Sequence, residues 1–389
     1  MASVQARALR NGIIAAVVTA LVGFGLGELF GGDHAARRTE SPSPTEHPSP
    51  PCRPSADRLA GPAERGIAGG FTDVWLGHAG GGWAVGYDGD PATDATAILA
   101  RWDRSAFSSE GGVPASDPID VLEAVDGSGR DDVWAVGWSS DGYAQNGLSM
   151  HYDGIAWSTA TAPTGASLLD VRVVAPGDAW AVGRAGNPKY VEERAFVAHW
   201  DGSSWTSASI PTFGGRSGLL AIDGTATDLW AVGYLHHGPL LLHYDGTEWS
   251  RSDAVFARPP QMPPQRGALT GVSVAHRTVW VAGSTIYRGN GSRFSPQLEP
   301  PRGEAYEDVV ASDVRTAWGV GSVAAKSGPG SRPAVVGITP DGLAAPPVAA
   351  HGAELRAIAA SPDGAIAVGV RRTGSSGVVP LVAAIDTCA

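Results

Sequence analysis

One short string recurs along the chain and constrains the fold more than any other feature. The clearest copies are DDVWAVGW (131–138), GDAWAVGR (177–184) and TDLWAVGY (227–234), and weaker copies stand before and after them. Successive copies are centred 38 to 51 residues apart, so the chain contains seven units of one repeat. The central residues are Trp83, Trp134, Trp180, Trp230, Trp280, Trp318 and Ile366.

A second string marks a tight turn late in the unit. It reads HYDGIAW (151–157), HWDGSSW (199–205) and HYDGTEW (243–249), and its Asp-Gly pair suits a hairpin between two strands. Within the unit 168–210, four apolar stretches are separated by turns, which indicates four antiparallel strands. Seven such units predict an all-β fold, a seven-bladed β-propeller of four-stranded antiparallel blades over residues 55–389. The composition agrees, because 53 glycines and only 17% charged residues suit short strands and tight turns.

The first residues do not belong to the repeat. Arg7 and Arg10 precede an uncharged run of 16 residues, which is long for the apolar core of a signal peptide and short for a membrane span of about 20 residues. We therefore expect residues 12–32 to be a transmembrane anchor or an uncleaved signal segment, with cleavage as the alternative. The basic flank predicts a short cytoplasmic N-terminus, 1–11, and the Pro/Ser-rich stretch 33–54 predicts a stiff linker. The expected location is the cell membrane, single-pass with the propeller outside, or secretion if the segment is cleaved.

The chain ends before its last unit is complete. Asp386 stands where other units have the Asp of the Asp-Gly turn, so a fourth strand is missing. We expect residues 53–60, just before the first unit, to supply this outer strand and close the ring. The only two cysteines, Cys52 and Cys388, flank that junction, and an even count outside the cytoplasm predicts a disulfide between them. Because the bond would close a loop of more than 300 residues, it would stabilise the folded chain by roughly 4–5 kcal/mol in the chain-entropy model. The alternative is that the two cysteines are unrelated free thiols.

The pairing of WAVG with a later DGxxW turn resembles several propeller repeat families. HWDGSSWTS at 199–207 is most similar to the tectonin repeat, which has an aromatic-Gly-Val strand followed by a W/Y-D-G-x-x-W hairpin. The turn also resembles the Asp-box of BNR, or sialidase-like, propellers, although its Asp-to-Trp spacing is one residue short. Kelch-like propellers, including the central domain of galactose oxidase, share the late-strand Gly and the outer-strand Trp but have a double Gly. The resemblance implies the fold, whereas its members include lectins, hydrolases, oxidases and binding scaffolds.

Residues that recur at one blade position are interpreted as structural, because every blade needs them. This interpretation covers the tryptophans of both strings and the aspartates of the turns. His151, His199 and His243 also recur, once in each of three units. Because the blades are separated around the ring and these histidines are expected on third strands away from its axis, they cannot converge on one metal ion.

Recognition is expected where the blades differ. The residue after WAVG differs between the copies, and the loop that follows it is expected to open on the same rim of the ring in every blade. These loops carry most of the aromatic residues that the repeat does not explain. The candidate ligand-binding residues of this rim are Tyr87, Trp138, Tyr143, Lys189, Tyr190, Tyr234, His236, His237, Tyr287 and Arg288.

Sequence motifs for catalysis and metal binding are lacking. The chain has no HExxH, GxSxG, P-loop or paired CxxC pattern, and the stretch around Asp88 and Asp90 lacks the later carboxylate of a Ca²⁺ loop. We therefore expect no catalytic residue, no metal and no cofactor. A formal net charge of −11 argues against a general affinity for nucleic acid.

These patterns together predict a non-catalytic, monomeric binding module outside the cytoplasm. Its expected partner is an extracytoplasmic protein or a cell-envelope glycan, held by the rim of loops between second and third strands. The alternative is a propeller hydrolase of the sialidase or glycosidase type, which needs carboxyl groups about 5–9 Å apart in the central channel.

Overall fold

The computed structural model describes residues 58–59, 67–78, 80–111, 113, 117–142, 144–186, 193–257, 267–298, 304–324, 331–345, 348, 350, 352–361, 364–373 and 377–385. Every regular element in these ranges is a β-strand. The predicted anchor, the linker and the pair Cys52 and Cys388 lie outside these ranges and stay predictions. No helix within the ranges has the length and apolar character needed to cross a membrane.

The strands form one sheet for each unit of the repeat. Blade one contains β2 (Gly70–Leu76), β3 (Gly82–Asp88), β4 (Thr96–Trp102) and β5 (Phe107–Ser109). Blade two contains β6 (Ile119–Gly129), β7 (Asp132–Ser140), β8 (Gln145–Tyr152) and β9 (Trp157–Thr159). Blade three contains β10 (Ala166–Ala175), β11 (Asp178–Ala185), β12 (Arg194–Trp200) and β13 (Trp205–Ser207). Blade four contains β14 (Ser217–Thr225), β15 (Asp228–Leu235), β16 (Gly238–Tyr244) and β17 (Trp249–Arg251).

The remaining blades vary at their outer edge. Blade five contains β19 (Gly271–Ala275), β20 (Thr278–Ala282), β21 (Tyr287–Gly289) and β22 (Arg293–Pro296), and β18 (Val255–Phe256) adds a parallel fifth strand outside β22. Blade six contains β23 (Glu304–Ala311), β24 (Ala317–Ala324), β25 (Ser331–Thr339) and β26 (Gly342–Ala344). Blade seven contains β27 (Ala353–Ser361), β28 (Gly364–Thr373), β29 (Gly377–Ile385) and β1 (Arg58–Leu59).

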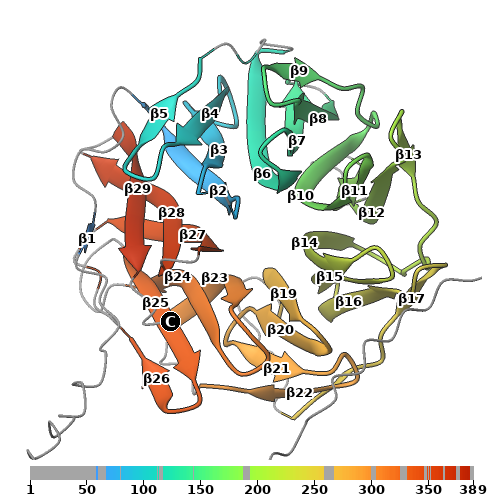
Figure 1. Cartoon of the computed structure of the whole chain (residues 1–389). Helices are drawn as coiled ribbons and strands as arrows, with labels where there is room; N and C mark the ends of the chain where they lie inside the picture. Colours follow the sequence, from blue (N-terminus) through green and yellow to red (C-terminus); the bar gives the residue numbers. More distant parts are fainter. Residues whose placement is uncertain are drawn as a thin grey trace, which may run out of the picture. The chain divides into compact units, whose positions relative to one another are not determined.

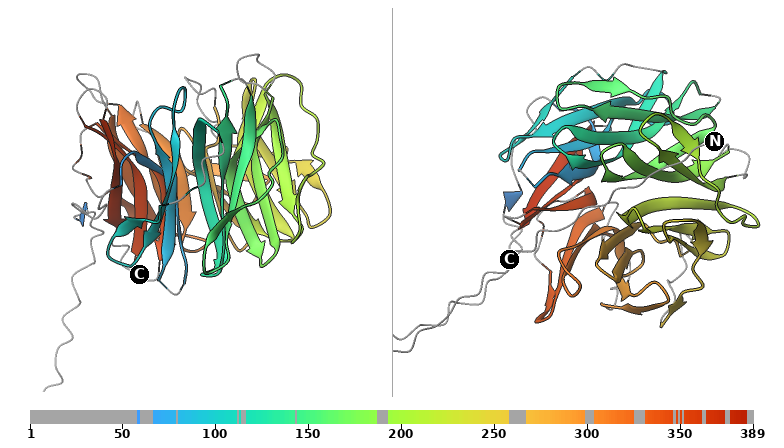
Figure 2. Two further views of the ribbon diagram at one scale, coloured as in Figure 1. Left: turned by 90° about the horizontal axis from the view of Figure 1, so that it is seen from above. Right: turned by 45° about the vertical axis from the view of Figure 1, so that its right-hand side comes forward.

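The blades surround a central channel, and the first strand of each blade lies nearest to it (Figure 1). Viewed from the side, the strands run from one face of the ring to the other (Figure 2). We call the face with the connections between second and third strands the loop face, and the face with the turns between first and second strands the turn face. The prediction of a seven-bladed propeller with four-stranded antiparallel blades is thereby confirmed.

The ring is closed by the N-terminal segment. Arg58 pairs with Ala384 and Leu59 with Ala383, so β1 is the outer strand of blade seven and runs antiparallel to β29. The expectation that residues just before the first unit complete the last blade is confirmed for these two residues. A backbone bond from Gly69 N to Val378 O, 3.3 Å long, adds a second contact across this seam.

The WAVG part of each second strand is apolar and buried because a blade is covered on both sides by its neighbours. In β7, every residue from Val133 to Ser140 is buried. In six of the seven blades the glycine that ends the WAVG string lies beside an extra residue in the first strand; at Gly137, for example, a Cβ would stand 1.9 Å from Val121 O. Only glycine fits there, which explains why this position of the string does not vary.

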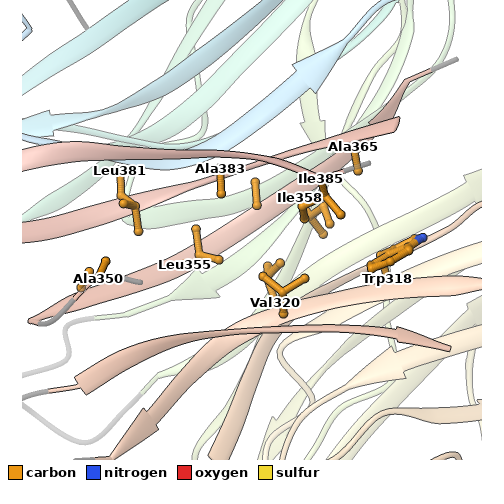
Figure 3. Close-up of a cluster of buried hydrophobic side chains, with 12 residues drawn as sticks. Trp318, Val320, Ala350, Leu355, Ile358, Ala365, Leu381, Ala383 and Ile385 are labelled. Carbon is orange, nitrogen blue, oxygen red and sulfur yellow. The ribbon is translucent and has the colours of Figure 1, made fainter. Parts of the chain in front are cut away.

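The hydrophobic core is divided into clusters, each between two neighbouring blades. Figure 3 shows the cluster between blades six and seven, where Trp318 and Val320 of β24 meet Leu355 and Ile358 of β27 and Leu381 of β29. Burial of such large apolar side chains between every pair of blades is the main stabilising contribution to the ring.

The recurring histidines have partners within their own blades. His151 Nε2 lies 2.8 Å from Asp132 Oδ1, and the pairs His199–Asp178 and His243–Asp228 have the same distance. Each imidazole also packs on the tryptophan of the WAVG string in its own blade, with ring centroids 4.1–4.6 Å apart. The turn aspartates likewise accept bonds from amides of their own turn, as in Asp201 with Ser203 N and Ser204 N at 2.9 Å.

Side chains of the first strands tie each blade to the next around the channel. A carboxylate or hydroxyl oxygen in one blade accepts a backbone N–H of the next blade's first strand at 2.7–3.0 Å. Six neighbouring pairs of blades have such a tie. The pairs are Asp73 to Val125, Asp126 to Val173, Asp170 to Ile222, Asp223 to Val274, Ser273 to Ala311 and Asp308 to Ile358. We call this set of oxygens the channel wall.

Candidate functional site

The loop-face end of the channel, which we call the channel mouth, is framed by residues that the blades do not share. Six of the seven first strands show a register shift there, which places one extra residue in the strand. Such a bulge re-aims the side chains around it. The extra residues are Thr72, Glu123, Leu169, Leu220, Glu307 and Arg356.

The most connected group at the mouth is centred on Glu193, and we call it the Glu193 cluster. The Glu193 side chain is fully shielded from solvent, and its Oε1 lies 3.2 Å from Arg184 Nη1. Its Oε2 accepts a bond from Arg216 Nε and a second from the Tyr234 hydroxyl at 3.0 Å. Arg184 and Tyr234 are the residues after WAVG in blades three and four, so two variable positions meet on one acid.

The Glu193 cluster holds its charges in a fixed arrangement. Burial acts to raise the pKa of the Glu193 carboxyl, but the bond from Arg216 and the charge of Arg184 outweigh it and hold the pKa below its usual range. The Arg216 guanidinium lies 5.8 Å from the centroid of the Tyr234 ring, a cation–π distance. Two guanidinium groups share one carboxylate, so the cluster itself has one more cation than anion, and the charge of Arg184 also acts on Glu123.

A second group joins Trp138 to Glu123 on the side of blades one and two. Trp138 Nε1 donates to Glu123 Oε1 at 2.9 Å, and the indole itself is 7% exposed and packs against Ile119 and Val121. Burial raises the pKa of Glu123, while the bond from Trp138 and the charges of Arg356 and Arg184 act in the opposite direction. Trp138 therefore orients an acid at the mouth and does not offer a free ring face.

A third group lies between blades six, seven and one. Arg356 Nη1 is 3.4 Å from the Tyr87 hydroxyl, and its guanidinium carbon is 5.9 Å from the centroid of that ring. Burial and the neighbouring charge of Glu354 raise the pKa of Glu307, and the charge of Arg356 lowers it. This side of the mouth has two carboxyl groups, Glu307 and Glu354, and one arginine, whereas the Glu193 cluster has one carboxyl group and two arginines.

The other predicted rim residues are placed differently. His236 and His237 are exposed in the turn between β15 and β16, with ring centroids 4.0 Å apart, and they stand on the loop face as expected. Tyr287 is only 1% exposed and packs on Phe256 in the core, while Arg288 lies opposite Trp280 at the position that histidine holds in blades two to four. The connection before β21 is shorter than the sequence indicated, so these two residues belong to a strand and not to the rim. The remaining predicted residues, Tyr143, Lys189 and Tyr190, lie outside the described residues.

Sequence reasoning missed the acids and bases that the variable positions contact. Glu123, Glu307 and Arg356 lie in the first strands, from which no candidate was chosen, and Glu193 and Arg216 flank strands of blades three and four. A signal was present: at the position of the extra residue, the first strands have Thr, Glu, Leu, Leu, Glu and Arg in turn. The rule that sites form where blades differ applies to this position as well.

The described residues offer recognition groups at the mouth and buried carboxyl groups in the channel wall. No group of three or more His, Cys, Asp or Glu side chains within them could hold a metal ion. The carboxylates of the channel wall are engaged with backbone amides of the next blade, which leaves them as structural acceptors. The mouth instead presents fixed charges of both signs beside tyrosine rings.

This chain is similar to known proteins in its fold alone. No protein-family model matches the chain. No curated protein matches it either. A solved structure titled "YCF48 bound to D1 peptide" is similar, with a TM-score of 0.54 and 14% identity, covering 82% of this chain and 94% of that one. A second, "Structure of YjhT", has a TM-score of 0.47 and 10% identity, covering 72% of this chain and 98% of that one.

Proposed function

We propose that the protein is a non-catalytic binding module that holds an extended peptide segment of a partner protein at the channel mouth. The observation that carries this proposal is the division of charge there. The Glu193 cluster has one carboxyl group and two arginines on the side of blades three and four, and Glu307 and Glu354 stand with one arginine on the side of blades six and seven. A peptide can satisfy both sides, with an acidic group toward Arg216 and a basic group toward Glu307.

The surroundings of these charges suit a peptide. Leu169 and Leu220 occupy the extra positions of blades three and four, so the mouth also has an apolar side for a hydrophobic residue. Tyr87 and Tyr234 are half-buried, and tyrosine supplies contact area at low entropic cost. Their hydroxyls are already oriented, by Arg356 and by Glu193, so little order has to be gained on binding. The similar propeller YCF48 is bound to D1 peptide, which is a precedent for peptide recognition on this fold.

The proposed location rests on the sequence. The apolar segment with its basic flank and the Pro/Ser-rich linker support a propeller held outside the membrane, and we propose that the partner protein lies there too. A protease added to intact cells tests this location. Cleavage in the linker is expected, and full protection of the chain would contradict it.

Selection from a random peptide library on the immobilised full chain tests the function. We expect enriched peptides with at least one acidic group, and binding weakened at least tenfold by Arg216→Gln, because a charge pair at a partly desolvated site is lost. The matched control is Arg251→Gln, the same chemical change on the exposed outer strand β17 of blade four, with unchanged affinity expected.

Two results would contradict the proposal. Equal affinity of the enriched peptides for both variants would place the site elsewhere. Failure to enrich any peptide, together with binding of a neutral envelope glycan that Arg216→Gln weakens, would support the glycan alternative for the same mouth. Hydrolysis of a glycoside by the chain, abolished by substitution of a channel carboxylate, would instead establish the hydrolase alternative.

A further inference from the structure

A cavity opens at the opposite end of the channel, away from the mouth. It has a volume of about 690 Å³ and is lined by the turn-face halves of the first strands of all seven blades. From the channel it extends outward over blades one and two, and we call this extension the side arm. The side arm is lined by Trp75, His78, Gly81, Trp83, Arg101, Arg130 and Tyr152.

The side arm exists because blade one departs from the repeat. In blades two to four, an aspartate two residues before the WAVG tryptophan holds the histidine that covers this ring, as Asp132 holds His151 over Trp134. In blade one, Gly81 replaces the aspartate and Arg101 replaces the histidine. Among the described residues no atom lies within 4 Å of a Cβ added at Gly81, and Gly81, Trp83 and Arg101 all line the cavity, so space remains where blades two to four have the aspartate.

The chemistry of the side arm combines aromatic rings with cations. Trp75 is half-buried, and Trp83 packs on Tyr152 with ring centroids 4.9 Å apart. The Arg101 guanidinium lies 6.0 Å from the centroid of the Trp83 ring. The Arg101 side chain is 58% exposed, and its ion pair with Glu110 is long at 3.9 Å. Arg130 and His78 are also exposed on this wall. The carboxylates that line the cavity already have partners: Asp126 binds Val173 N and Arg172, Asp223 binds Val274 N, and Asp308 binds Ile358 N.

We propose that the side arm binds an acidic sugar, with its carboxylate toward Arg101 and Arg130 and its ring against Trp75. Arginine recognises carboxylates through its planar fork of donors, and aromatic rings pack on the C–H faces of sugars. Five lining residues on the walls of blades one and two, Gly77, Gly81, Gly82, Gly127 and Gly129, are glycines, which bring backbone groups rather than apolar side chains to a ligand with many hydroxyls. The volume of the whole cavity, about 690 Å³, is in the range of small-ligand sites, and the side arm is its extension over blades one and two. This site lies on the other face from the mouth and does not depend on the peptide proposal.

Titration calorimetry of the full chain with trigalacturonic acid tests this proposal. We expect binding with a Kd below about 1 mM, weaker at high salt because the arginines are exposed. The methyl ester of the same trisaccharide has the same rings without the charges, and its affinity is expected to fall at least fivefold.

The key variant is Gly81→Asp, which restores the carboxylate of blades two to four and places a negative charge in the open space. It is expected to weaken binding at least tenfold. The matched control is Gly214→Asp, since Gly214 is also exposed, also has no atom within 4 Å of a Cβ, and lies in the connection between β13 and β14. Its affinity should be unchanged, and equal melting temperatures of both variants will show that the fold is retained.

Three results would overturn the proposal. The first is the absence of binding of trigalacturonic acid by the unsubstituted chain. The second is equal affinity of Gly81→Asp and the unsubstituted chain. The third is an equal or higher affinity for the methyl ester, because charge would then have no part in recognition.

Discussion

The wall and the mouth of the channel use the same kinds of side chain for different purposes. In the wall, Asp73, Asp170 and Asp308 each accept one amide of their own strand and one of the next blade. At the mouth, Glu123 and Glu193 accept bonds from side chains of tryptophan, tyrosine and arginine. A carboxylate bound to fixed backbone cannot turn toward a ligand, whereas side-chain partners can exchange one acceptor for another. The kind of hydrogen-bond partner therefore distinguishes the structural carboxylates of the channel wall from the candidate binding residues of the mouth.

Loss of a wall carboxylate should have the largest effect. Asp170→Ala leaves the amides of Val171 and Ile222 without an acceptor in the channel, and we expect about 2–4 kcal/mol less free energy of unfolding in urea. The control, Asp201→Ala, also removes bonds to two amides, but in an exposed turn, and should cost less than about 1 kcal/mol. Equal losses of unfolding free energy in the two variants would mean that a wall carboxylate contributes no more to stability than an aspartate in an exposed turn.

The wall should also make stability depend on pH. Burial, together with the charges of Asp308 and Asp126, raises the pKa of Asp73 to about 8, against bonds from Val125 N and Val74 N that lower it, and burial raises the pKa of Asp308 to about 7. The folded chain therefore binds these protons more tightly than the unfolded chain, and stability is lost as pH rises toward 8. We expect the free energy of unfolding to fall by roughly 1–3 kcal/mol between pH 6 and pH 8.5. Stability that is constant or rises over this interval would contradict the assignment.

At the mouth, a single hydroxyl should affect binding and leave stability nearly unchanged. Tyr234→Phe removes the bond to Glu193 Oε2 and loosens the Glu193 cluster, so we expect a three- to tenfold loss of affinity for a selected peptide. The loss of unfolding free energy should stay below about 1 kcal/mol. Tyr244→Phe, in the third strand of the same blade, is the control and should bind as before. If Tyr234→Phe lowers the stability without changing the affinity for the peptide, Tyr234 is a structural residue and not part of the binding site.

The smallest effect is expected from Trp138→Phe. The substitution keeps an aromatic ring in the pocket of Ile119 and Val121 but removes the N–H that Glu123 accepts. Because that bond lowers the pKa of Glu123, its loss should raise the pKa further and shift the pH dependence of peptide binding upward. Affinity at pH 7 should change by about twofold. An unchanged pH profile would show that Glu123 does not face the ligand.

The repeat predicted the scaffold well because the same structural residues recur in several blades of one chain. The WAVG tryptophans, the paired histidines and the turn aspartates have the expected structural roles, and the incomplete last unit correctly indicated that an N-terminal strand closes the ring. The site was predicted only in part. Tyr87, Trp138 and Tyr234 were identified as variable positions, but their partners Arg356, Glu123 and Glu193 were not.

The missed partners have a physical reason. Whether a first-strand residue points into a blade or toward the mouth depends on the bulge, and a one-residue shift of register reverses the alternation of side chains. The bulge at Leu122/Ala124 must be known before Glu123 can be placed, and the variation between blades at this position does not by itself reveal the bulge. Tyr287 was misplaced for a similar reason. The connection between β20 and β21 is short, so Tyr287 begins a strand and lies in the core, whereas a longer loop would have placed it on the rim.

Hydrogen exchange of the full chain with and without a selected peptide tests the central claim most directly. If the mouth is the binding site, amides around Arg184, Arg216–Ser217 and Tyr234 on one side and Glu354–Arg356 on the other should exchange more slowly with peptide bound. The turn face, including Gly127–Arg130 and Gly177–Asp178, should be unaffected. Protection confined to the turn face, or to the outer strands, would contradict the account.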